Sequence, residues 1–466
     1  MTAKADSAPL SFTEKLGYGL GDMASNFYLG FFSLYLLYYY TDVYGLAPGL
    51  VGLMLLIAKI TDALSDPIMG IISDRTESRW GKYRPYLLWG AVPYGLLGIA
   101  IFFGPNFSDT GKLIYAYVTY IGVMVAFTVM NVPYSALLAV ISPVAEERTK
   151  ATTFRFVFAA GGSLFVAMLA TPLVKLFGGG DDVVGFRLTM LLFAVGSIAL
   201  FWFTFATTKE RIQLPRHSSS GMNDIKILLK NVSWVVLAIA CIVILLALVA
   251  RFASIIYYVK YYMQDDGKTV FLFLDRVAFF TSLGLVGQIL GSMITSRLTS
   301  LFSKHYLVLY SCLLHTVLLV ISYFIPADMY GLAVALHFLG MLTFGVVITV
   351  LFAMFTDCAE YGEWLTGQRS SGLTVSASMF ALKFGSALGG AIPAFILGFI
   401  GFVANETPSE YVRHGIQAMA TLLPAILFAI GGALMLFYKI DKDLLVRIEA
   451  ELIKRREELP VEPLAG

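Results

Sequence analysis

Long apolar runs, separated by short polar stretches, dominate the pattern of residues along this chain. A run of about 20 apolar residues forms a helix long enough to cross a hydrocarbon core of about 30 Å. Because a membrane core offers no water to unpaired backbone groups, runs of this length predict helices and exclude exposed strands. The predicted fold class is an all-α polytopic membrane protein with twelve transmembrane helices, near residues 17–41, 48–73, 85–104, 113–141, 152–177, 187–207, 232–262, 273–296, 305–325, 329–356, 374–403 and 416–439.

The longest polar stretch inside the chain separates the first six predicted helices from the last six. Two similar halves around a central path are a common transporter layout, with the substrate site near the middle of the bilayer. We therefore expect an N-terminal six-helix bundle at 1–207, a central cytoplasmic linker at 208–231, a C-terminal six-helix bundle at 232–440 and a cytoplasmic tail at 441–466. The charged pattern of the tail predicts a short amphipathic helix.

Composition supports a lipid environment and narrows the class of function. Hydrophobic residues make up 58% of the chain and charged residues 14%, whereas soluble domains carry about 25% charged residues. The formal net charge of +2 gives no strongly basic surface for nucleic acid. The three cysteines are far apart and match no metal or disulfide spacing. Without a His–Glu metal motif, a nucleophile elbow or a phosphate-binding glycine loop, the sequence predicts neither an enzyme nor a bound cofactor.

Basic residues set the expected orientation. Most of the 33 Lys and Arg residues fall before the first predicted helix, in every second loop and in the tail. Because cytoplasmic loops are enriched in Lys and Arg, both termini are predicted to be cytoplasmic. The expected location is the plasma membrane, as a multi-pass protein of the bacterial inner membrane.

Ionisable residues inside a span are costly unless they face a cavity or a partner. Asp62 and Asp66 are four residues apart in the second predicted helix and share one face with Lys59. Two stacked carboxylates stay ionised only if a cation joins them, and otherwise one takes a proton. They predict a site for Na⁺, Li⁺ or H⁺; the alternative is that they pair with Lys or Arg and lock helices together. Lys383, inside the eleventh helix, needs a carboxylate partner, for which Asp62 or Asp66 is the candidate.

Two further predicted helices carry polar residues at membrane depth. Tyr18, Asp22 and Asn26 follow one another at one-turn spacing on one face of the first helix, which predicts hydrogen bonds and aromatic stacking to a sugar. Helix packing, helped by nearby glycines, is the alternative. Thr128 and Asn131 share a face of the fourth helix, although polar residues also join membrane helices to one another.

Charged residues crowd two segments on the predicted cytoplasmic side. The loop after the second helix is mostly basic and the segment after the tenth helix is acidic. We expect the two segments to meet across the halves and close a cytoplasmic gate; the alternative is that the basic residues only anchor the topology. The gating residues would be Asp74, Arg75, Arg79, Lys82 and Arg84 in the first segment, and Asp357, Glu360 and Glu363 in the second.

Seven stretches of the sequence together resemble one known family: EKLGYGLGDMASNF, LLYYYTD, DALSDPIMG, SRWGKYRPYLLWG, NVPYSAL, RFVFA and TDCAEYGEW. They are similar to those of the glycoside–pentoside–hexuronide cation symporters, a family of the major facilitator superfamily that includes the melibiose permease. The similarity covers nearly the whole chain. It implies the major facilitator fold, with two pseudo-symmetric six-helix bundles, and transport by alternating access.

The resemblance also implies roles for individual residues. The cation site of the family uses two carboxylates that match Asp62 and Asp66, a threonine that matches Thr128, and a third carboxylate whose position is taken here by Asn131. The implied substrate site departs from the family pattern at several positions, so galactoside recognition is not carried over. With the residues of the first helix, the expected substrate-binding set is Tyr18, Asp22, Asn26, Asn131, Ser135, Arg155 and Lys383.

Together these features predict a secondary active transporter that couples inward H⁺ or Na⁺ movement to uptake of a glycoside, a pentoside or a uronide. The missing acid at Asn131 shifts the expectation toward H⁺. The expected partners are a small-molecule sugar, the coupling cation and the lipid bilayer, and a monomer is expected to suffice. Two alternatives stay open: a lipid or lysolipid transporter on the same scaffold, and a sugar sensor that does not transport.

Overall fold

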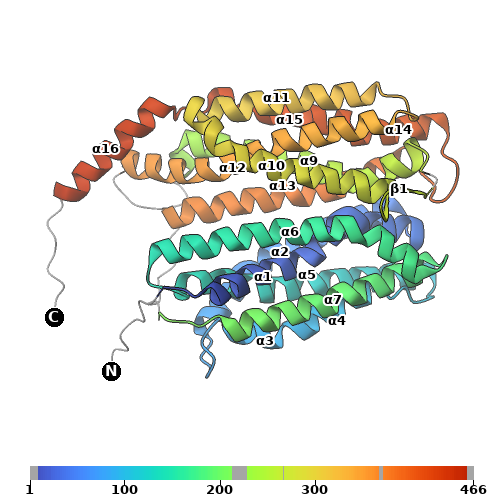
Figure 1. The fold of residues 1–466 in the computed structure, drawn as a ribbon, viewed down its shortest axis with the longest axis horizontal. Helices are drawn as coiled ribbons and strands as arrows, with labels where there is room; N and C mark the ends of the chain where they lie inside the picture. Colours follow the sequence, from blue (N-terminus) through green and yellow to red (C-terminus); the bar gives the residue numbers. More distant parts are fainter. Residues whose placement is uncertain (1–8, 213–227, 266, 367–370, 459–466) are drawn as a thin grey trace.

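The computed structural model describes residues 9–212, 228–265, 267–366 and 371–458, and long helices make up nearly all of it (Figure 1). The helices up to α7 form one half of the molecule, and those from α9 onward form the other. We name the two ends of this elongated bundle after the elements that mark them in Figure 1, the α16 end and the β1 end. The middle of the predicted linker lies outside the described residues.

The first half begins with a helix that changes its winding on the way to the β1 end. Helix α1 continues through two π-helical segments, η1 and η2, before a short loop leads into the next helix. The elements of this half are α1 (Phe12–Phe31), η1 (Phe32–Leu36), η2 (Tyr39–Val43), α2 (Pro48–Arg75), α3 (Arg84–Trp89), α4 (Ala91–Ile101), α5 (Asp109–Val140), α6 (Ala145–Gly178) and α7 (Asp182–Thr207).

The second half repeats this pattern and adds a small hairpin and a tail helix. The hairpin pairs β1 (Thr269–Phe271) antiparallel with β2 (Leu274–Asp275). The predicted tail helix is present as α16 (Lys442–Glu458). The other elements are α9 (Val232–Tyr257), η3 (Tyr258–Tyr262), α10 (Arg276–Leu301), α11 (Lys304–Tyr323), α12 (Tyr330–Thr366), α13 (Ser371–Phe399), α14 (Glu410–Ala420), α15 (Leu422–Leu434) and the 3₁₀ segment η4 (Met435–Phe437).

Ten helical stretches in the described ranges are long and apolar enough to cross a membrane, and they match ten of the twelve predicted spans. One of them, Glu410–Phe437, runs through α14, α15 and η4. The other two predicted spans are interrupted helices. One is α1 with its π-helical continuation. The other is split into α3 and α4 at Gly90, where Pro93 has no N–H to bond the carbonyl of Trp89.

Glycines let neighbouring helices approach closely within each half. A Cβ added at Gly19 would lie 3.0 Å from the backbone of Phe154, so α1 rests directly on α6. A Cβ added at Gly291 of α10 would lie 1.9 Å from the carbonyl oxygen of Leu342 in α12. Lipid gives no hydrophobic force between helices, so membrane bundles depend on close packing of this kind.

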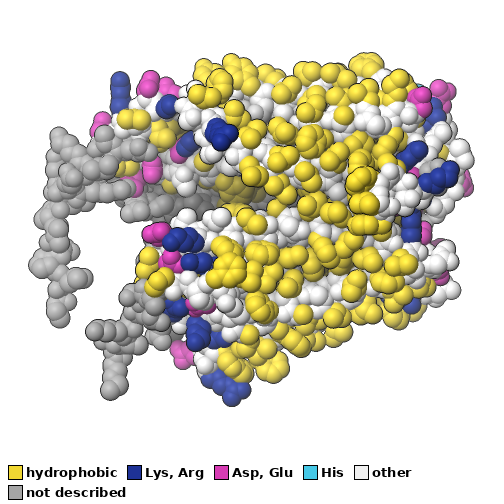
Figure 2. Space-filling model, in the orientation of Figure 1, with side chains coloured by type: hydrophobic (Ala, Val, Ile, Leu, Met, Phe, Trp, Pro, Cys, Tyr) yellow, Lys and Arg dark blue, Asp and Glu magenta, His cyan; other side chains and the backbone are white. Residues whose placement is uncertain are grey.

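Two long seams join the halves, where α2 packs on α13 and α6 packs on α10, and η1 also packs on α9. Apolar side chains form a broad band over the face shown in Figure 2, and charged side chains gather at its two ends. The same face is hollowed between the halves at the α16 end. The band matches the apolar surface that a bilayer requires.

We predict that Gly291→Ala destabilises the protein, although replacing a helical glycine by alanine usually stabilises a helix by roughly 0.5–1 kcal/mol. The new methyl group would force α10 away from α12. A lowered thermal midpoint of the detergent-solubilised protein would be the measured result. Gly161→Ala is the control, because a Cβ there meets nothing within 4 Å; equal midpoints for the two variants would contradict the close contact.

Candidate functional site

Two carboxylates of α2 meet one lysine of α13 at the seam between the halves. Lys383 Nζ lies 3.5 Å from Asp62 Oδ2 and forms a closer ion pair with Asp66. The Asp62 side chain is 4% exposed, whereas Asp66 is 27% and Lys383 is 35% exposed. Lys383 therefore has the carboxylate partners that its depth in the eleventh predicted helix required, and the contact joins the two halves.

Asp62 is also held by α5. Thr128 Oγ1 donates to Asp62 Oδ1 at 2.9 Å, and Ser65 Oγ donates to Thr128 Oγ1 at 3.1 Å. Asp66 Oδ1 is buried and has no hydrogen-bond partner among the described residues. Lys59 forms no ion pair with a described residue. We name Asp62, Asp66, Thr128 and Lys383 the carboxylate cluster; it offers oxygen atoms of the kind that a hard cation or a proton binds, and one of them is still open.

Asn131 and Ser135 lie on α5 beyond Thr128, and both are half-buried. Neither side chain forms a hydrogen bond to a described residue. Asn131 therefore does not join the carboxylate cluster in this conformation. The predicted roles of Asn131 in cation binding and of both residues in substrate binding stay predictions.

The polar face of α1 that was predicted from Tyr18, Asp22 and Asn26 is joined to α6 by an ion pair. Arg155 Nε lies 3.1 Å from Asp22 Oδ2, and its guanidinium lies 5.0 Å from the centre of the Tyr134 ring. Tyr134 stacks on Tyr18 with ring centroids 4.9 Å apart and donates to the Tyr18 carbonyl. Tyr18 is fully buried, so in this conformation its ring packs against Tyr134 and does not line the cavity described next.

A cavity of about 850 Å³ lies between the halves, walled by α1 and α6 on one side and by α9, α10 and α12 on the other. Asn26 is the one predicted substrate-binding residue among the described residues that line it. Its amide nitrogen donates to the Asp22 carbonyl at 2.8 Å, and its amide oxygen accepts from Ser163 Oγ at 3.1 Å. The volume falls within the range of about 300–1,000 Å³ that is typical of small-molecule sites.

The wall that the second half contributes to this cavity was not predicted from the sequence. Gln288 and Ser292 of α10 line it, as does Thr349 of α12. Gln288 and Ser292 are four residues apart, so their shared face could have been noticed. Single hydroxyl and amide residues in apolar helices are common, however, and only the packing of the halves brings these residues opposite α1 and α6.

Three of the predicted gating residues of the first loop are held within their own half: Asp74, Lys82 and Arg84. Tyr83 donates to Asp74 Oδ1 at 2.8 Å, and burial together with this hydrogen bond raises the pKa of the Tyr83 phenol. The backbone N–H groups of Lys82, Tyr83 and Arg84 donate to the Glu210 carboxylate.

On the second half, Lys304 of α11 binds both oxygens of Asp357 at 2.8 and 2.7 Å. The contact expected between the two charged segments would close the α16 end, which is the hollowed end in this conformation. That gate, formed by Asp74, Arg75, Arg79, Lys82, Arg84, Asp357, Glu360 and Glu363, stays a prediction for another conformation.

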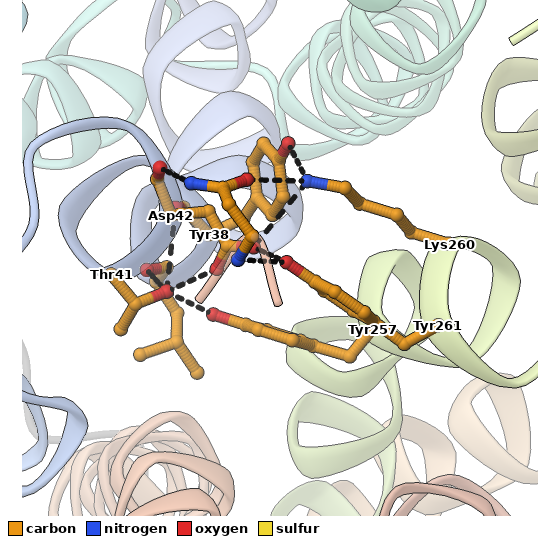
Figure 3. Close-up of polar contacts among 8 residues, drawn as sticks. Tyr38, Thr41, Asp42, Tyr257, Lys260 and Tyr261 are labelled. Atoms are coloured by element: carbon orange, nitrogen blue, oxygen red, sulfur yellow. Dashed lines mark hydrogen bonds and ion pairs between the residues drawn. The ribbon is translucent and has the colours of Figure 1, made fainter. Parts of the chain in front are cut away.

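The β1 end is closed by a network that the sequence analysis did not predict (Figure 3). Asp42, at the end of η2, has a side chain with 0% exposure; Tyr261 donates to it, and Lys260 Nζ lies 3.5 Å from it. Lys260 also donates to Tyr38 at 2.8 Å, and Thr41 shares a 2.7 Å hydrogen bond with the hydroxyl of Tyr257. We name these six residues the Asp42 latch. It joins the first half to η3 and α9 of the second.

A second pair reinforces this closure with the charges reversed. Lys175 of α6 lies 2.7 Å from Asp275 Oδ2, and Thr171 donates to Asp275 Oδ1 at 2.9 Å. Asp275 also caps α10 by accepting from the Ala278 N–H. No local signal in the sequence marks these contacts, because Asp42 and Lys260 are 218 positions apart and each falls at the end of a predicted span.

We predict that Asp42→Asn loosens the β1 end, because Lys260 loses its carboxylate partner. Spin labels at Phe107 and Phe271, both exposed near this end, would report a broader distance distribution by pulsed electron spin resonance. Asp328→Asn is the control: this exposed acid lies at the same end, in the loop between α11 and α12, and forms no ion pair with a described residue. Identical distributions for Asp42→Asn and the unmodified protein would show that the latch does not hold the halves together.

The sequence is similar to known proteins along nearly its whole length. The family model described as MFS/sugar transport protein matches residues 17–442. YagG of Escherichia coli (strain K12), provisionally named a glycoside/cation symporter, is 34% identical over 450 residues, which are 96% of each chain. The isoprimeverose transporter of Lactiplantibacillus pentosus is 33% identical over 92% of this chain and 89% of its own. The glucuronide carrier protein homolog of Escherichia coli (strain K12) is 30% identical over 96% of this chain and 97% of its own.

Solved structures agree on the fold. The crystal structure of a D-xylose–proton symporter matches with a TM-score of 0.64 and 13% identity, covering 91% of this chain and 95% of that one. A bacterial homolog of the lysosomal transporter Spinster matches with a TM-score of 0.67 and 13% identity, covering 94% of this chain and 96% of that one. Because the family model spans nearly the whole sequence, this protein is a membrane transporter of the MFS/sugar transport family and a member of its glycoside–pentoside–hexuronide cation symporters.

Proposed function

We propose that this protein couples the inward movement of H⁺ or Na⁺ to the uptake of a glycoside, a pentoside or a uronide across the bacterial inner membrane. Relatives named as glycoside, isoprimeverose and glucuronide carriers support a sugar as the substrate. The Lys and Arg distribution supports cytoplasmic termini, which would make the α16 end the cytoplasmic end. A monomer would suffice, since both walls of the cavity come from one chain.

The observation that carries this proposal is the ion pair from Lys383 of the second half to Asp66 and Asp62 of the first. In a low-dielectric site, stacked carboxylates need positive charge nearby. In this conformation Lys383 supplies that charge. A coupling cation bound at Asp62 and Asp66 would compete with Lys383, and its binding would therefore loosen a contact between the halves. This competition links ion occupancy to the arrangement of the halves.

The choice of cation depends on how many oxygen ligands the cluster can gather. The Asp62 and Asp66 carboxylates, with Asp66 Oδ1 unpartnered among the described residues, and the Thr128 hydroxyl suffice for a proton. Na⁺ prefers more oxygen ligands, and Asn131 would have to turn its amide oxygen into the site. We favour H⁺, because Asn131 takes the place of a third acid and forms no hydrogen bond to the carboxylates in this conformation.

The described conformation would be the one that releases substrate to the cytoplasm. The Asp42 latch and the Lys175–Asp275 pair close the β1 end, while the molecule is hollowed at the α16 end. In the opposite conformation these contacts would break and the predicted cytoplasmic gate would form. Alternating access would then be an exchange of polar contacts between the two ends.

We predict that Asp66→Asn abolishes uphill accumulation of substrate, because the amide neither releases a proton nor binds Na⁺ as a carboxylate does. Exchange of labelled for unlabelled substrate, which needs no net cation movement, should persist and would show that the variant is folded. Asp109→Asn, which removes an exposed acid at the start of α5, serves as the control. Full uphill accumulation by Asp66→Asn would refute the cation site.

The decisive experiment is a record of cation flux in de-energised cells that express the protein. Glycosides, pentosides and uronides are added in turn while external pH and Na⁺ are followed. Alkalinisation with one solute would identify H⁺ coupling, and a fall in external Na⁺ would identify Na⁺ coupling. If neither external pH nor external Na⁺ changes with any solute, although the protein is detected in the membrane, symport of these sugars would be rejected.

A further inference from the structure

The cavity between the halves has no charged side chain among its described lining residues. Its polar lining consists of hydroxyl and amide groups, and the rest is aliphatic or aromatic. A carboxylate-bearing substrate needs a positive partner when it leaves water. An uncharged wall does not provide one.

The basic residues that neighbour this cavity or join the halves already have partners. Arg251, which precedes the lining residue Phe252, is buried, donates to the Ala420 carbonyl and contacts His337 Nδ1. Arg155, which neighbours the lining residues of α6, is paired with Asp22. Lys383 is paired with Asp66 and Asp62 at the other seam. To bind an anionic sugar here, the protein would have to redirect one of these side chains, either by breaking an ion pair with an acid or by moving the buried Arg251 from its partners. The charges therefore favour a neutral substrate.

Gln288 is the polar group of α10 that remains available to a ligand. The two hydroxyl groups of α10 that line the cavity already donate to backbone carbonyls. Ser292 donates to the Gly345 carbonyl at 3.1 Å, and Thr281 donates to the Val277 carbonyl at 2.9 Å. The Gln288 amide lines the cavity and forms no hydrogen bond to a described residue. Its donor and acceptor together suit a pair of adjacent sugar hydroxyls.

The first half presents a matching amide in a fixed position. Asn26 is held by its bonds to the Asp22 carbonyl and to Ser163, and its oxygen keeps a second lone pair for a ligand. A sugar bonded to Asn26 on one wall and to Gln288 on the other would bridge the two halves. Such a bridge would favour closure of the cavity around the sugar.

Apolar side chains from both halves line the same cavity. Phe156 is 56% exposed and Met293 is 69% exposed, although both line the cavity. The rings of Phe156 and Phe352, one from each half, meet edge to face with centroids 6.1 Å apart. Covering this surface with a second apolar group is favourable, and a sugar ring alone, with its many hydroxyls, covers it poorly.

From these observations we infer that the cavity binds a neutral glycoside with an apolar aglycone, and that Gln288 is the sugar-binding residue of the second half. The aglycone would lie against Phe156, Phe352 and Met293. This inference rests on the proposed sugar transport and goes beyond it in naming the chemical class of the substrate and the residue that selects it.

The test measures binding to the full-length protein in lipid nanodiscs. The probes are glucose, galactose and xylose, their 4-nitrophenyl glycosides, and 4-nitrophenyl glucuronide. We expect at least one neutral nitrophenyl glycoside to bind about tenfold or more tightly than its free sugar and than the glucuronide. Equal or tighter binding of the glucuronide, or of the free sugars, would overturn the inference.

The variants test the two parts of the site separately. Gln288→Leu should weaken binding of that glycoside about tenfold, with partial recovery in Gln288→Asn and no change in the thermal midpoint or in cation affinity. Met293→Ala should weaken the nitrophenyl glycoside but not its free sugar. Ser296→Ala, an exposed position on α10 outside the cavity lining, is the control. Unchanged affinity in Gln288→Leu would remove this residue from the site.

Failure of this inference can be told apart from failure of the proposed transport. A glucuronide that drives cation flux would leave symport intact while overturning the neutral class of substrate. A lack of flux with every sugar, neutral or charged, would reject the transport proposal itself.

Discussion

The ion pair between Lys383 and the two carboxylates of α2 is the contact on which the rest of this structure depends. All three charges lie inside membrane-spanning helices, where an unpaired ionised group is costly. Asp62 and Asp66 come from the first half and Lys383 from the second, so satisfying these charges also fixes how the halves meet along the α2–α13 seam. A mobile cation could satisfy the same carboxylates without joining the halves, and that difference is a physical basis for coupling.

At the β1 end, the halves are also joined by pairs of acidic and basic side chains. Asp42 with Lys260, and Asp275 with Lys175, form two acid–base pairs of opposite sense, so each half contributes one acid and one base. Paired in this way, the charges can lie in a closed interface, and a conformational change must provide them with water or new partners. The cavity between these pairs and the hollowed α16 end is lined by uncharged groups. If this cavity binds the substrate as proposed, recognition and closure would use different side chains.

The sequence predicted well those features that depend on neighbours along one helix. Asp62, Asp66 and Lys59 share a face because of helical spacing, and the depth of Lys383 required a carboxylate partner that α2 supplies. Glycines that the sequence offered as packing residues do bring α1 against α6, as at Gly19. The interruptions were harder to predict: Pro93 breaks the third predicted span at Gly90, and α1 becomes π-helical beyond Phe31. An apolar count over a window does not detect such local changes in backbone hydrogen bonding.

The sequence by itself determined the membrane environment, the order of the spans and the presence of acidic residues at depth, because each follows from the cost of placing polar groups in hydrocarbon. Tertiary structure decided which polar residues meet. Gln288 and Asn26 line one cavity, and Asp42 reaches Lys260 across 218 positions, only because two bundles pack face to face. Periodicity along one helix reports which side of that helix is polar. It does not report which distant helix lies opposite, and that pairing creates the cavity and closes one end of it.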